Sequence, residues 1–394
     1  MLIKSALTLC VCLFSLAINA QNNEITSVLE QVKQNNNELK AFALRLKGKQ
    51  FELKSTNTLD DLQVGAYYLP YGEHASTNYT EFQISQSFEF PSVYMARKKL
   101  INKQIRDFEL AYGIKKQEVL ATANKYCIEL IALNKTVGIE QIRMEQAKQV
   151  YEHIKSKYEE EQVGVLSLNK AKVAWLQAQF VVQEIELKQQ RLLVELQTIN
   201  GGNAVLLTSS EFIDSYNLPT VDSLWKEKRS AEPYLISLQQ KEAIALQEIK
   251  LSRHKLLPDL TAGFNQQGFA QEYYSGFFGG IAIPIFGNKN KLEVAKTNYK
   301  TQQSYTTVLS IEMKTAFESR YKEYTLLLGK YEAYNQTLEG LNSAALLLEA
   351  YTLGEFSFTE YYMELQFYRQ AANVLLDMEK QLNLIKADLL KHQL

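Results

Sequence analysis

The feature that most constrains this chain is an internal repeat. The segment FEFPSVYMARKKL, which contains Pro91, has a counterpart in IAIPIFGNKNKL, which contains Pro284. Both read apolar-X-apolar-Pro before a long segment with a basic start. The two prolines are 193 positions apart, and Tyr158 and Tyr351, near the far ends of the long segments, share that offset. Self-similarity at a fixed period is typical of an architecture built repeatedly from one unit, so two equivalent halves are predicted.

Each half reads in the same order: a first helix, two strands, a long helix and a return helix. Apolar and polar residues alternate in the strands, as Phe82, Ile84 and Phe88 do with Glu81 and Gln83. Each strand is about ten residues long, the length that crosses a bilayer when tilted. The expected strands span about 59–69, 79–90, 259–268 and 273–285, and the expected first helices about 24–54 and 231–257.

The long segments predict unusually long helices. No proline occurs between Val93 and about Gln162, and apolar residues recur there at every seventh position, as in a coiled-coil seam. About 70 residues at 1.5 Å each give roughly 105 Å of helix, which is longer than a compact domain. Return helices are expected over about 169–199 and 361–391. Residues 201–230, which contain glycine, proline and serine, predict a linker with room for a small mixed subdomain.

The N-terminus predicts export. Lys4 precedes an apolar run that closes on Ala20, the pattern of a cleaved signal peptide. Without that segment Cys127 is the one remaining cysteine, so neither an intramolecular disulfide nor a zinc cluster is expected. The predicted organisation is a signal peptide at 1–20, a first repeat at 21–200, a linker or equatorial segment at 201–230 and a second repeat at 231–394.

Charge and chemistry exclude several classes of function. The 43 basic and 44 acidic residues nearly balance, which argues against a nucleic-acid partner. His74, His153, His254 and His392 have no carboxylate or thiol at metal-ligand spacing. No serine or cysteine lies in a nucleophile-elbow or phosphate-loop context. The sequence therefore predicts neither an enzyme nor a cofactor nor a metal site.

The four amphipathic strands predict an oligomer. They cannot close a barrel within one chain, and an open sheet edge in lipid leaves backbone groups unpaired at a cost of several kcal/mol each. Two copies would supply eight strands and a barrel filled by its own side chains, whereas three would supply twelve and an open lumen. The residues alone leave this choice open.

At this point the chain resembles a known family. The strand ends FEFP and IAIPIFG and the turn YTLGEFSFTEYYMELQFYRQA are similar to those of the TolC-type outer-membrane efflux proteins. The resemblance implies a mostly α fold with a small β part, assembled as a homotrimer. It further implies a twelve-stranded β-barrel in outer-membrane lipid and a periplasmic α-helical barrel. Such a duct conducts its substrates passively, and its helical tips dock to a periplasmic adaptor and an inner-membrane pump of the proton-driven RND class.

The substrate stays open at this stage. The stretch GVLSLNKAKVA resembles the heavy-metal exporters within the family, but drugs or other small solutes remain alternatives. An exit duct for type I protein secretion is a rival within transport. A periplasmic coiled-coil interaction protein, such as an adaptor, is a rival from another class. Adaptors carry one helical hairpin, whereas this chain predicts two.

The resemblance also implies adaptor-contact tips and barrel–helix junctions. The family's tip glycine matches Gly354, while the equivalent position of the first half is Glu161 and the nearest glycine is displaced to Gly164. Pro91 and Pro284 match the junctions between barrel and helices. The implied tip contacts are Val163, Gly164, Gly354, Glu355 and Ser357.

The channel entrance is implied by three further residues. Glu360 lies six positions after the tip glycine, where the family places an acid that lines the entrance, and Glu364 follows one turn later on the same face. In a trimer each would form a ring of three negative charges that favours cations. Tyr351 matches a tyrosine that holds the entrance closed in some members. The acid expected as its partner is replaced by Ser167.

Overall fold

The computed structural model describes residues 24–70, 78–212, 215–269, 272–284, 289–339 and 343–394. The chain is mostly helical with one small antiparallel sheet, which confirms the expected fold class at that level. The expected signal peptide lies outside the described residues. Among the described helices, none is long and apolar enough to span a membrane.

The chain divides into two compact units, each built from separate stretches of sequence. The first unit comprises Met1–Lys40, Lys115–Ala231 and Lys314–Leu394. The second comprises Ala41–Ile114 and Glu232–Met313. Both halves of the repeat therefore contribute to both units.

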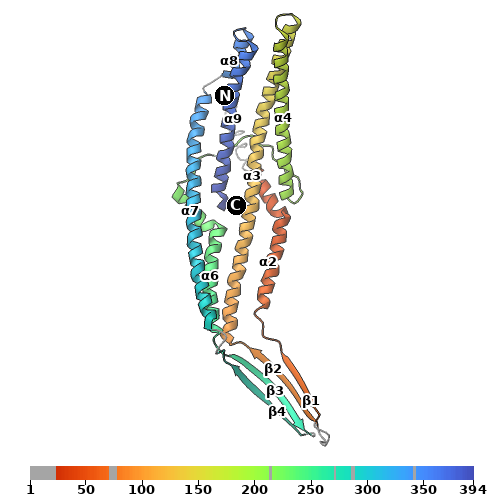
Figure 1. The fold of residues 1–394 in the computed structure, drawn as a ribbon, viewed down its shortest axis with the longest axis vertical. Coiled ribbons are helices and arrows are strands. Elements are labelled where there is room, and N and C mark those ends of the chain that lie inside the picture. Colours follow the sequence, from red (N-terminus) through yellow and green to blue (C-terminus); the bar gives the residue numbers. More distant parts are fainter. Residues whose placement is uncertain (1–23, 71–77, 213–214, 270–271, 285–288, 340–342) are drawn as a thin grey trace, which may run out of the picture. The chain divides into compact units, whose positions relative to one another are not determined.

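The second unit contains the sheet. Strands β1 (Gln63–Leu69), β2 (Tyr79–Phe88), β3 (Asp259–Phe269) and β4 (Glu272–Ala282) lie side by side in that order, and every pair is antiparallel (Figure 1). The central pair joins the two halves, because β2 belongs to the first and β3 to the second. Strand β1 starts four residues later than expected, and β2 and β4 end at Phe88 and Ala282, two and three residues before their expected ends at 90 and 285.

The register gives the sheet two unlike faces. Ile84 is opposite Val64 and Phe264, and Phe264 is opposite Phe277, so these side chains share one face. The alternate positions carry polar side chains on the other face, among them Glu81, Gln83, Asn265 and Gln267. The alternation predicted for β2 thus extends over the sheet.

Helices α3 (Pro91–Glu159) and α6 (Pro233–His254) pack together in the second unit. Both begin with proline, whose missing N–H is not needed in the first helical turn. Side chains of α6 reach α3 at three levels over about three turns. The contacts are Ser237 Oγ to Asp107 at 3.1 Å, Gln240 Nε2 to the Lys103 carbonyl at 2.6 Å and Gln247 Nε2 to the Ala96 carbonyl at 3.0 Å.

The junction at Pro91 is held by charge. The Glu89 carboxylate pairs with Arg97 and lies 3.9 Å from Lys255, and the Glu89 N–H donates to the Tyr94 hydroxyl at 3.1 Å. The last residues before the helix are thereby tied to its first two turns. The equivalent stretch after Pro284 lies outside the described residues.

The first unit contains two helical hairpins. One joins α3 to α4 (Val165–Ile199), and the other joins α8 (Ser343–Thr352) to α9 (Phe358–Leu389). Helix α7 (Lys289–Glu339) precedes α8, and residues 340–342 between them lie outside the description. Helix α5 (Val221–Ala231) and the short η1 (Lys391–Gln393) also belong to this unit.

The expected first helix is two helices. Residues 24–35 are helical, Asn36 is not, and α2 (Asn37–Ser55) follows. Asn36 Oδ1 accepts from the Leu39 N–H at 2.8 Å, and its Nδ2 donates to the Ile199 carbonyl at 2.7 Å. The Asn36 side chain therefore caps α2 and ties the break to the end of α4, a competition with helix typical of asparagine.

The segment expected as a linker, residues 201–230, contains helix α5 and irregular chain in its described part. Helix α5 packs on a buried core cluster of the first unit. That cluster consists of Leu224, Phe317, Tyr324, Leu382, Ile385 and Leu389.

Candidate functional site

The two helical tips have the same backbone turn, although their sequences differ. Glu161 has φ 61° and Gly354 has φ 84°, so both adopt the left-handed conformation. In each tip the next residue donates its N–H to a carbonyl five positions back, which is a Schellman motif. These bonds join Gln162 to Lys157 at 2.9 Å and Glu355 to Ala350 at 3.0 Å.

This geometry refines the interpretation of the first tip. Gly164 has φ −79° and ψ 159°, an extended conformation open to any residue, and a Cβ there would meet nothing within 4 Å. The residue that turns the chain is Glu161, at the position equivalent to Gly354. A non-glycine residue in this conformation costs roughly 1–2 kcal/mol, so the first tip stores strain that the second avoids.

A capping box holds the Glu360 side chain in place just after the second tip. Ser357 and Glu360 form a capping box at the start of α9, in which Glu360 Oε2 accepts from the Ser357 N–H at 2.9 Å. Hydrogen bonds from the side chain and the backbone of Ser357 lower the pKa of Glu360 below its usual value. Glu364 follows one turn later, and both side chains are exposed. The two acids thus lie on one accessible face of α9.

Tyr351 lies inside the molecule rather than on its surface. It is 8% exposed and stacks on Tyr361 with ring centroids 4.9 Å apart. The two tyrosines belong to a buried cluster, the tip cluster, that joins both hairpins and also includes Val150, Ile154, Ala171 and Leu365. Tyr158, the equivalent residue of the first half, is 40% exposed, so the repeat is not symmetric here.

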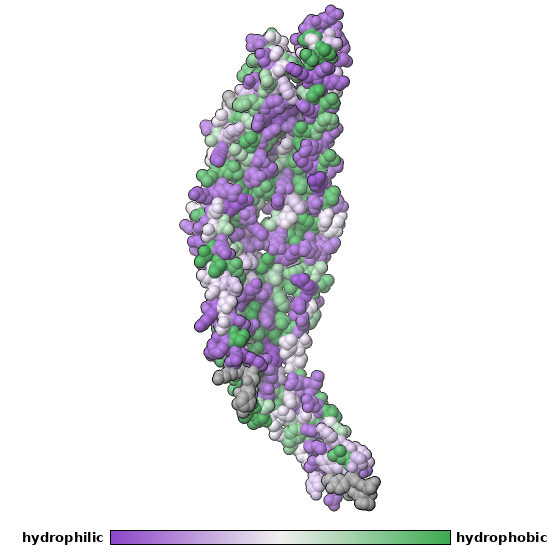
Figure 2. Space-filling view, viewed as in Figure 1, coloured by the Kyte–Doolittle hydropathy of each residue, from purple (hydrophilic) through white to green (hydrophobic). Residues whose placement is uncertain are grey.

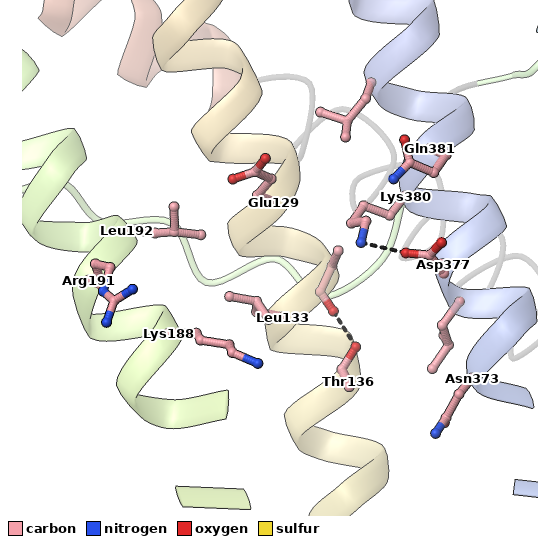
Figure 3. Close-up of a pocket in the computed structure, with 13 residues that line it drawn as sticks. Glu129, Leu133, Thr136, Lys188, Arg191, Leu192, Asn373, Asp377, Lys380 and Gln381 are labelled. Atoms are coloured by element: carbon pink, nitrogen blue, oxygen red, sulfur yellow. Dashed lines mark hydrogen bonds and ion pairs between the residues drawn. The ribbon is translucent and has the colours of Figure 1, made fainter. Parts of the chain in front are cut away.

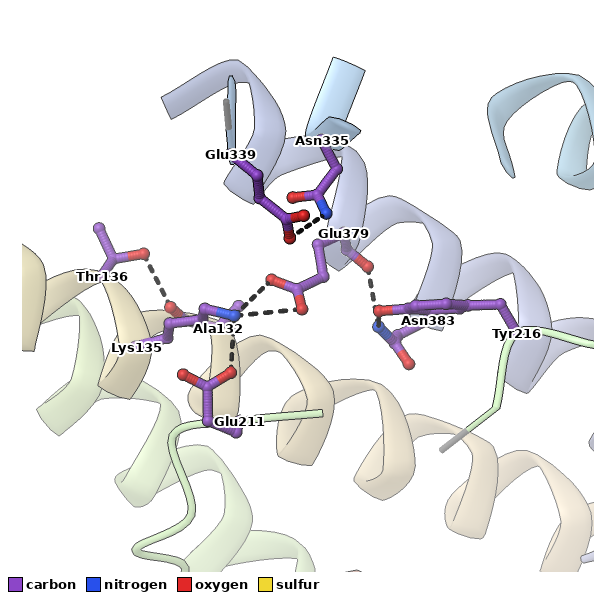
Figure 4. A network of polar contacts seen from close by, with 9 residues as sticks. All are labelled: Ala132, Lys135, Thr136, Glu211, Tyr216, Asn335, Glu339, Glu379 and Asn383. Carbon is purple, nitrogen blue, oxygen red and sulfur yellow. Dashed lines mark hydrogen bonds and ion pairs between the residues drawn. The ribbon is translucent and has the colours of Figure 1, made fainter. Parts of the chain in front are cut away.

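A polar network that the sequence did not predict lies in the middle of the first unit. Lys135 Nζ of α3 lies 3.0 Å from Glu379 Oε2 of α9 and 2.7 Å from Glu211 Oε2 of the linker (Figure 4). The Glu379 carbonyl accepts from Asn383 Nδ2 at 2.8 Å. Burial lowers the pKa of Lys135, but its hydrogen bonds to Glu211 and Glu379 outweigh burial and raise that pKa above the ordinary 10.5.

The irregular part of the linker is held by side chains of several helices. The Glu24 carboxylate accepts from the N–H and hydroxyl groups of Thr208 and Ser209, with the Ser209 hydroxyl at 2.7 Å. Asn134 Nδ2 donates to the Ser209 carbonyl at 2.9 Å, and the Tyr324 hydroxyl donates to the Tyr216 carbonyl at 2.6 Å. These contacts fix a segment that has no regular structure of its own.

A surface groove of about 460 Å³ runs between α3, α4 and α9 of the first unit. Its lining mixes leucines such as Leu133 and Leu192 with the charged Lys188, Arg191 and Asp377 (Figure 3). Apolar patches are likewise interspersed with hydrophilic surface over the helices in Figure 2. The groove carries no arrangement of groups suited to catalysis.

Metal and thiol chemistry find no support in the described residues. Within them, no group of three or more His, Cys, Asp or Glu side chains could hold a metal ion. Cys127 is fully buried, and burial raises the pKa of its thiol to about 12.

Solved structures share this fold. The chain matches a CusC structure, described in terms of folding and transmembrane channel formation, with 15% identity and a TM-score of 0.77 over 94% of this chain and 92% of that one. It matches the outer membrane protein VceC of Vibrio cholerae with 12% identity and a TM-score of 0.74, over 94% and 96% of the two chains. It matches the Campylobacter jejuni CmeC outer membrane channel with 15% identity and a TM-score of 0.68, over 94% and 85%.

The fold is therefore that of the TolC-type outer-membrane channels, as the sequence resemblance predicted. No protein-family model matches the sequence, and no curated protein matches it significantly.

Proposed function

We propose that this protein is an outer-membrane exit duct of a tripartite efflux system, which passively conducts small solutes. The observation that carries the proposal is the shared construction of the sheet. Each half of the repeat supplies one β-hairpin and one helical hairpin, and the two β-hairpins join into one four-stranded sheet. The solved channels with this fold cover nearly the whole chain.

The edges of the sheet support a homotrimer. Strands β1 and β4 are the two edge strands, and in lipid their outer backbone groups need partners. Pairing β1 of one copy with β4 of the next satisfies both edges. Three copies give a twelve-stranded barrel with an open lumen, whereas two give a barrel that side chains fill. A duct requires the open lumen.

The apolar face and the loop end of the sheet support contact with lipid. Phe277 is 91% exposed in the single chain, and Val64 and Ile281 are also exposed on the same face. Exposed tyrosines gather where the hairpin loops begin, as a membrane-interface girdle requires. Tyr68 and Tyr273 lie on the apolar face, and the equally exposed Tyr67 and Tyr274 lie on the polar face at the same end of the sheet.

The remaining roles follow from the sequence resemblance and are part of the proposal. The tips around Val163, Gly164, Gly354, Glu355 and Ser357 contact a periplasmic adaptor, which links the duct to a proton-driven inner-membrane pump. Glu360 and Glu364 line the entrance, Tyr351 holds it closed from within the tip cluster, and Pro91 and Pro284 mark the barrel–helix junctions. Metal cations are a candidate cargo beside drugs and other small solutes, because the stretch after the first tip resembles the heavy-metal exporters.

Planar-bilayer recording tests the duct. Purified protein added to a lipid bilayer should produce discrete conductance steps in KCl. A protein that inserts under no condition, including high voltage to favour opening, would contradict the proposal. A coiled-coil interaction protein would give that negative result.

The entrance has its own test, for which the capping box supplies a clean substitution. Glutamine replaces glutamate in this motif, so Glu360→Gln with Glu364→Gln removes two charges per chain and keeps the helix start. We expect a lower preference for cations and weaker block by trivalent cations. Ser357→Ala, which breaks the cap but keeps both charges, should leave the selectivity unchanged. An unaltered preference in the glutamine variant would remove these acids from the entrance.

A further inference from the structure

The strands carry charge of one sign. Among their described residues the ionised side chains are Glu81, Asp259 and Glu272, with no lysine or arginine. All three acids lie on the polar face. Glu81 is opposite Gln267 on β3, and Gln267 is opposite Tyr274 on β4. Asp259 and Glu272 stand an even number of positions from these residues, so they share the face.

Glu81 is held in place by neutral groups. Its Oε1 accepts from Asn265 Nδ2 at 2.8 Å, and its Oε2 accepts from the Tyr79 hydroxyl at 2.9 Å. The Tyr79 hydroxyl is also 3.0 Å from Gln267 Oε1. None of these partners brings a positive charge, and in the described part of the chain Glu81 forms no ion pair. Its carboxylate is thus positioned but not neutralised.

The same face of the sheet also carries small residues. Gly276 of β4 lies opposite Asn265, the residue that donates to Glu81, and a Cβ at Gly276 would meet nothing within 4 Å. Gly280 and Ala282 lie further along this face of β4, with Phe278 between Gly276 and Gly280, and Tyr67 of β1 is opposite Glu81. The described strands thus surround Glu81 with polar, small and aromatic side chains but with no cation.

We propose that Glu81 makes the barrel selective for cations, so that the duct passes positively charged solutes more readily than negatively charged ones. This rests on the proposed trimeric duct, in which the polar face lines the lumen. Three copies then place three Glu81 carboxylates at one level of the pore. A ring of acidic side chains inside a low-dielectric wall concentrates cations and repels anions. The selection is separate from that of Glu360 and Glu364, which lie in the other unit.

Reversal potentials in planar bilayers test this inference. With a KCl gradient near 0.1 M, Glu81→Gln should lower the permeability ratio of K⁺ to Cl⁻ by about threefold or more, because losing even about half a kT of potential lowers the K⁺ level and raises the Cl⁻ level enough to change their ratio by about that factor. The difference should shrink in 1 M KCl, where the Debye length is about 3 Å. Glu81→Gln should lower the K⁺ to Cl⁻ permeability ratio also in a protein that already carries Glu360→Gln and Glu364→Gln.

Two further variants separate charge from structure. Glu81→Asp keeps the charge and should keep most of the selectivity. Glu81→Gln with Gln83→Glu moves the charge two residues along the same face and should restore the cation selectivity. A channel that conducts normally but shows an unchanged K⁺ to Cl⁻ ratio in Glu81→Gln would overturn the inference and leave the duct intact. Absence of any conductance in the parent protein would instead contradict the duct itself.

Discussion

Replacing Lys135 by methionine should destabilise the middle of the first unit. The change removes the cation 3.0 Å from Glu379, whose side chain is 9% exposed, and keeps most of the apolar stem. Removing one partner of a fully buried pair costs about 3–5 kcal/mol. The Lys135 side chain is 20% exposed and the pair with Glu211 is largely solvated, so screening reduces the loss to about 2–3 kcal/mol.

Cys127 supplies the assay. It is buried on α3, two turns from Lys135, so a maleimide labels it only when the helix bundle opens. At 1.4 kcal/mol per factor of ten, the labelling rate of Lys135→Met should rise by about 30-fold to 150-fold. The rate should be compared at low reagent concentration, where labelling reports the equilibrium population of the open form.

Two controls decide what the acceleration means. Lys125→Met removes an exposed lysine of the same helix, 3.8 Å from Glu129, and should change the labelling rate by about twofold at most. Lys135→Met with Glu379→Gln leaves no unpaired buried charge and should recover part of the loss. If Lys135→Met labels no faster than Lys125→Met, the network contributes no stability and the reasoning is refuted.

Three smaller perturbations test other contacts. Burial raises the pKa of Glu24, but hydrogen bonds from Ser209 and Thr208 outweigh burial and lower that pKa below the ordinary 4.5. The stability that the Glu24 carboxylate gives to the linker is therefore present above pH 4.5 and is lost as the pH falls through the lowered value. Hydrogen exchange at the Thr208 and Ser209 amides should accelerate over that acidic range, and Glu24→Gln should show fast exchange already at neutral pH. Glu161→Gly should stabilise the first tip by about 0.5–1 kcal/mol, because relief of the left-handed strain exceeds the entropy cost of glycine; faster amide exchange in that tip would contradict the strain. Gly201→Ala should destabilise by more than about 1 kcal/mol, because φ is 66° and the new Cβ would lie 2.4 Å from the Asn35 carbonyl oxygen; an unchanged thermal midpoint would show that the turn relaxes.

Local patterns predicted the elements of this fold well. Alternation in β2 gave its two faces, and the proline-free run gave a helix of 69 residues. The capping box at Ser357 was readable as Ser-x-x-Glu, although its meaning for Glu360 needed the structure. These features depend on residues within a few positions of one another.

Features that depend on distant residues were missed. The break at Asn36 arises because Asn36 bonds to Ile199, and the ion pair of Lys135 with Glu379 joins residues 244 positions apart. No sequence pattern marks such partners. The alignment of the halves placed Glu161 at the position equivalent to Gly354, but the turn was assigned to the nearby Gly164 because glutamate rarely adopts a left-handed conformation. The two tips therefore share a left-handed backbone turn at equivalent positions, although the residue is glutamate in the first and glycine in the second.

Native mass spectrometry of the protein extracted from outer membranes in detergent tests the central claim most directly. The account predicts one assembly of three chains, each lacking its first twenty residues, found in the outer-membrane fraction. A single chain recovered from the soluble periplasmic fraction without detergent would contradict it.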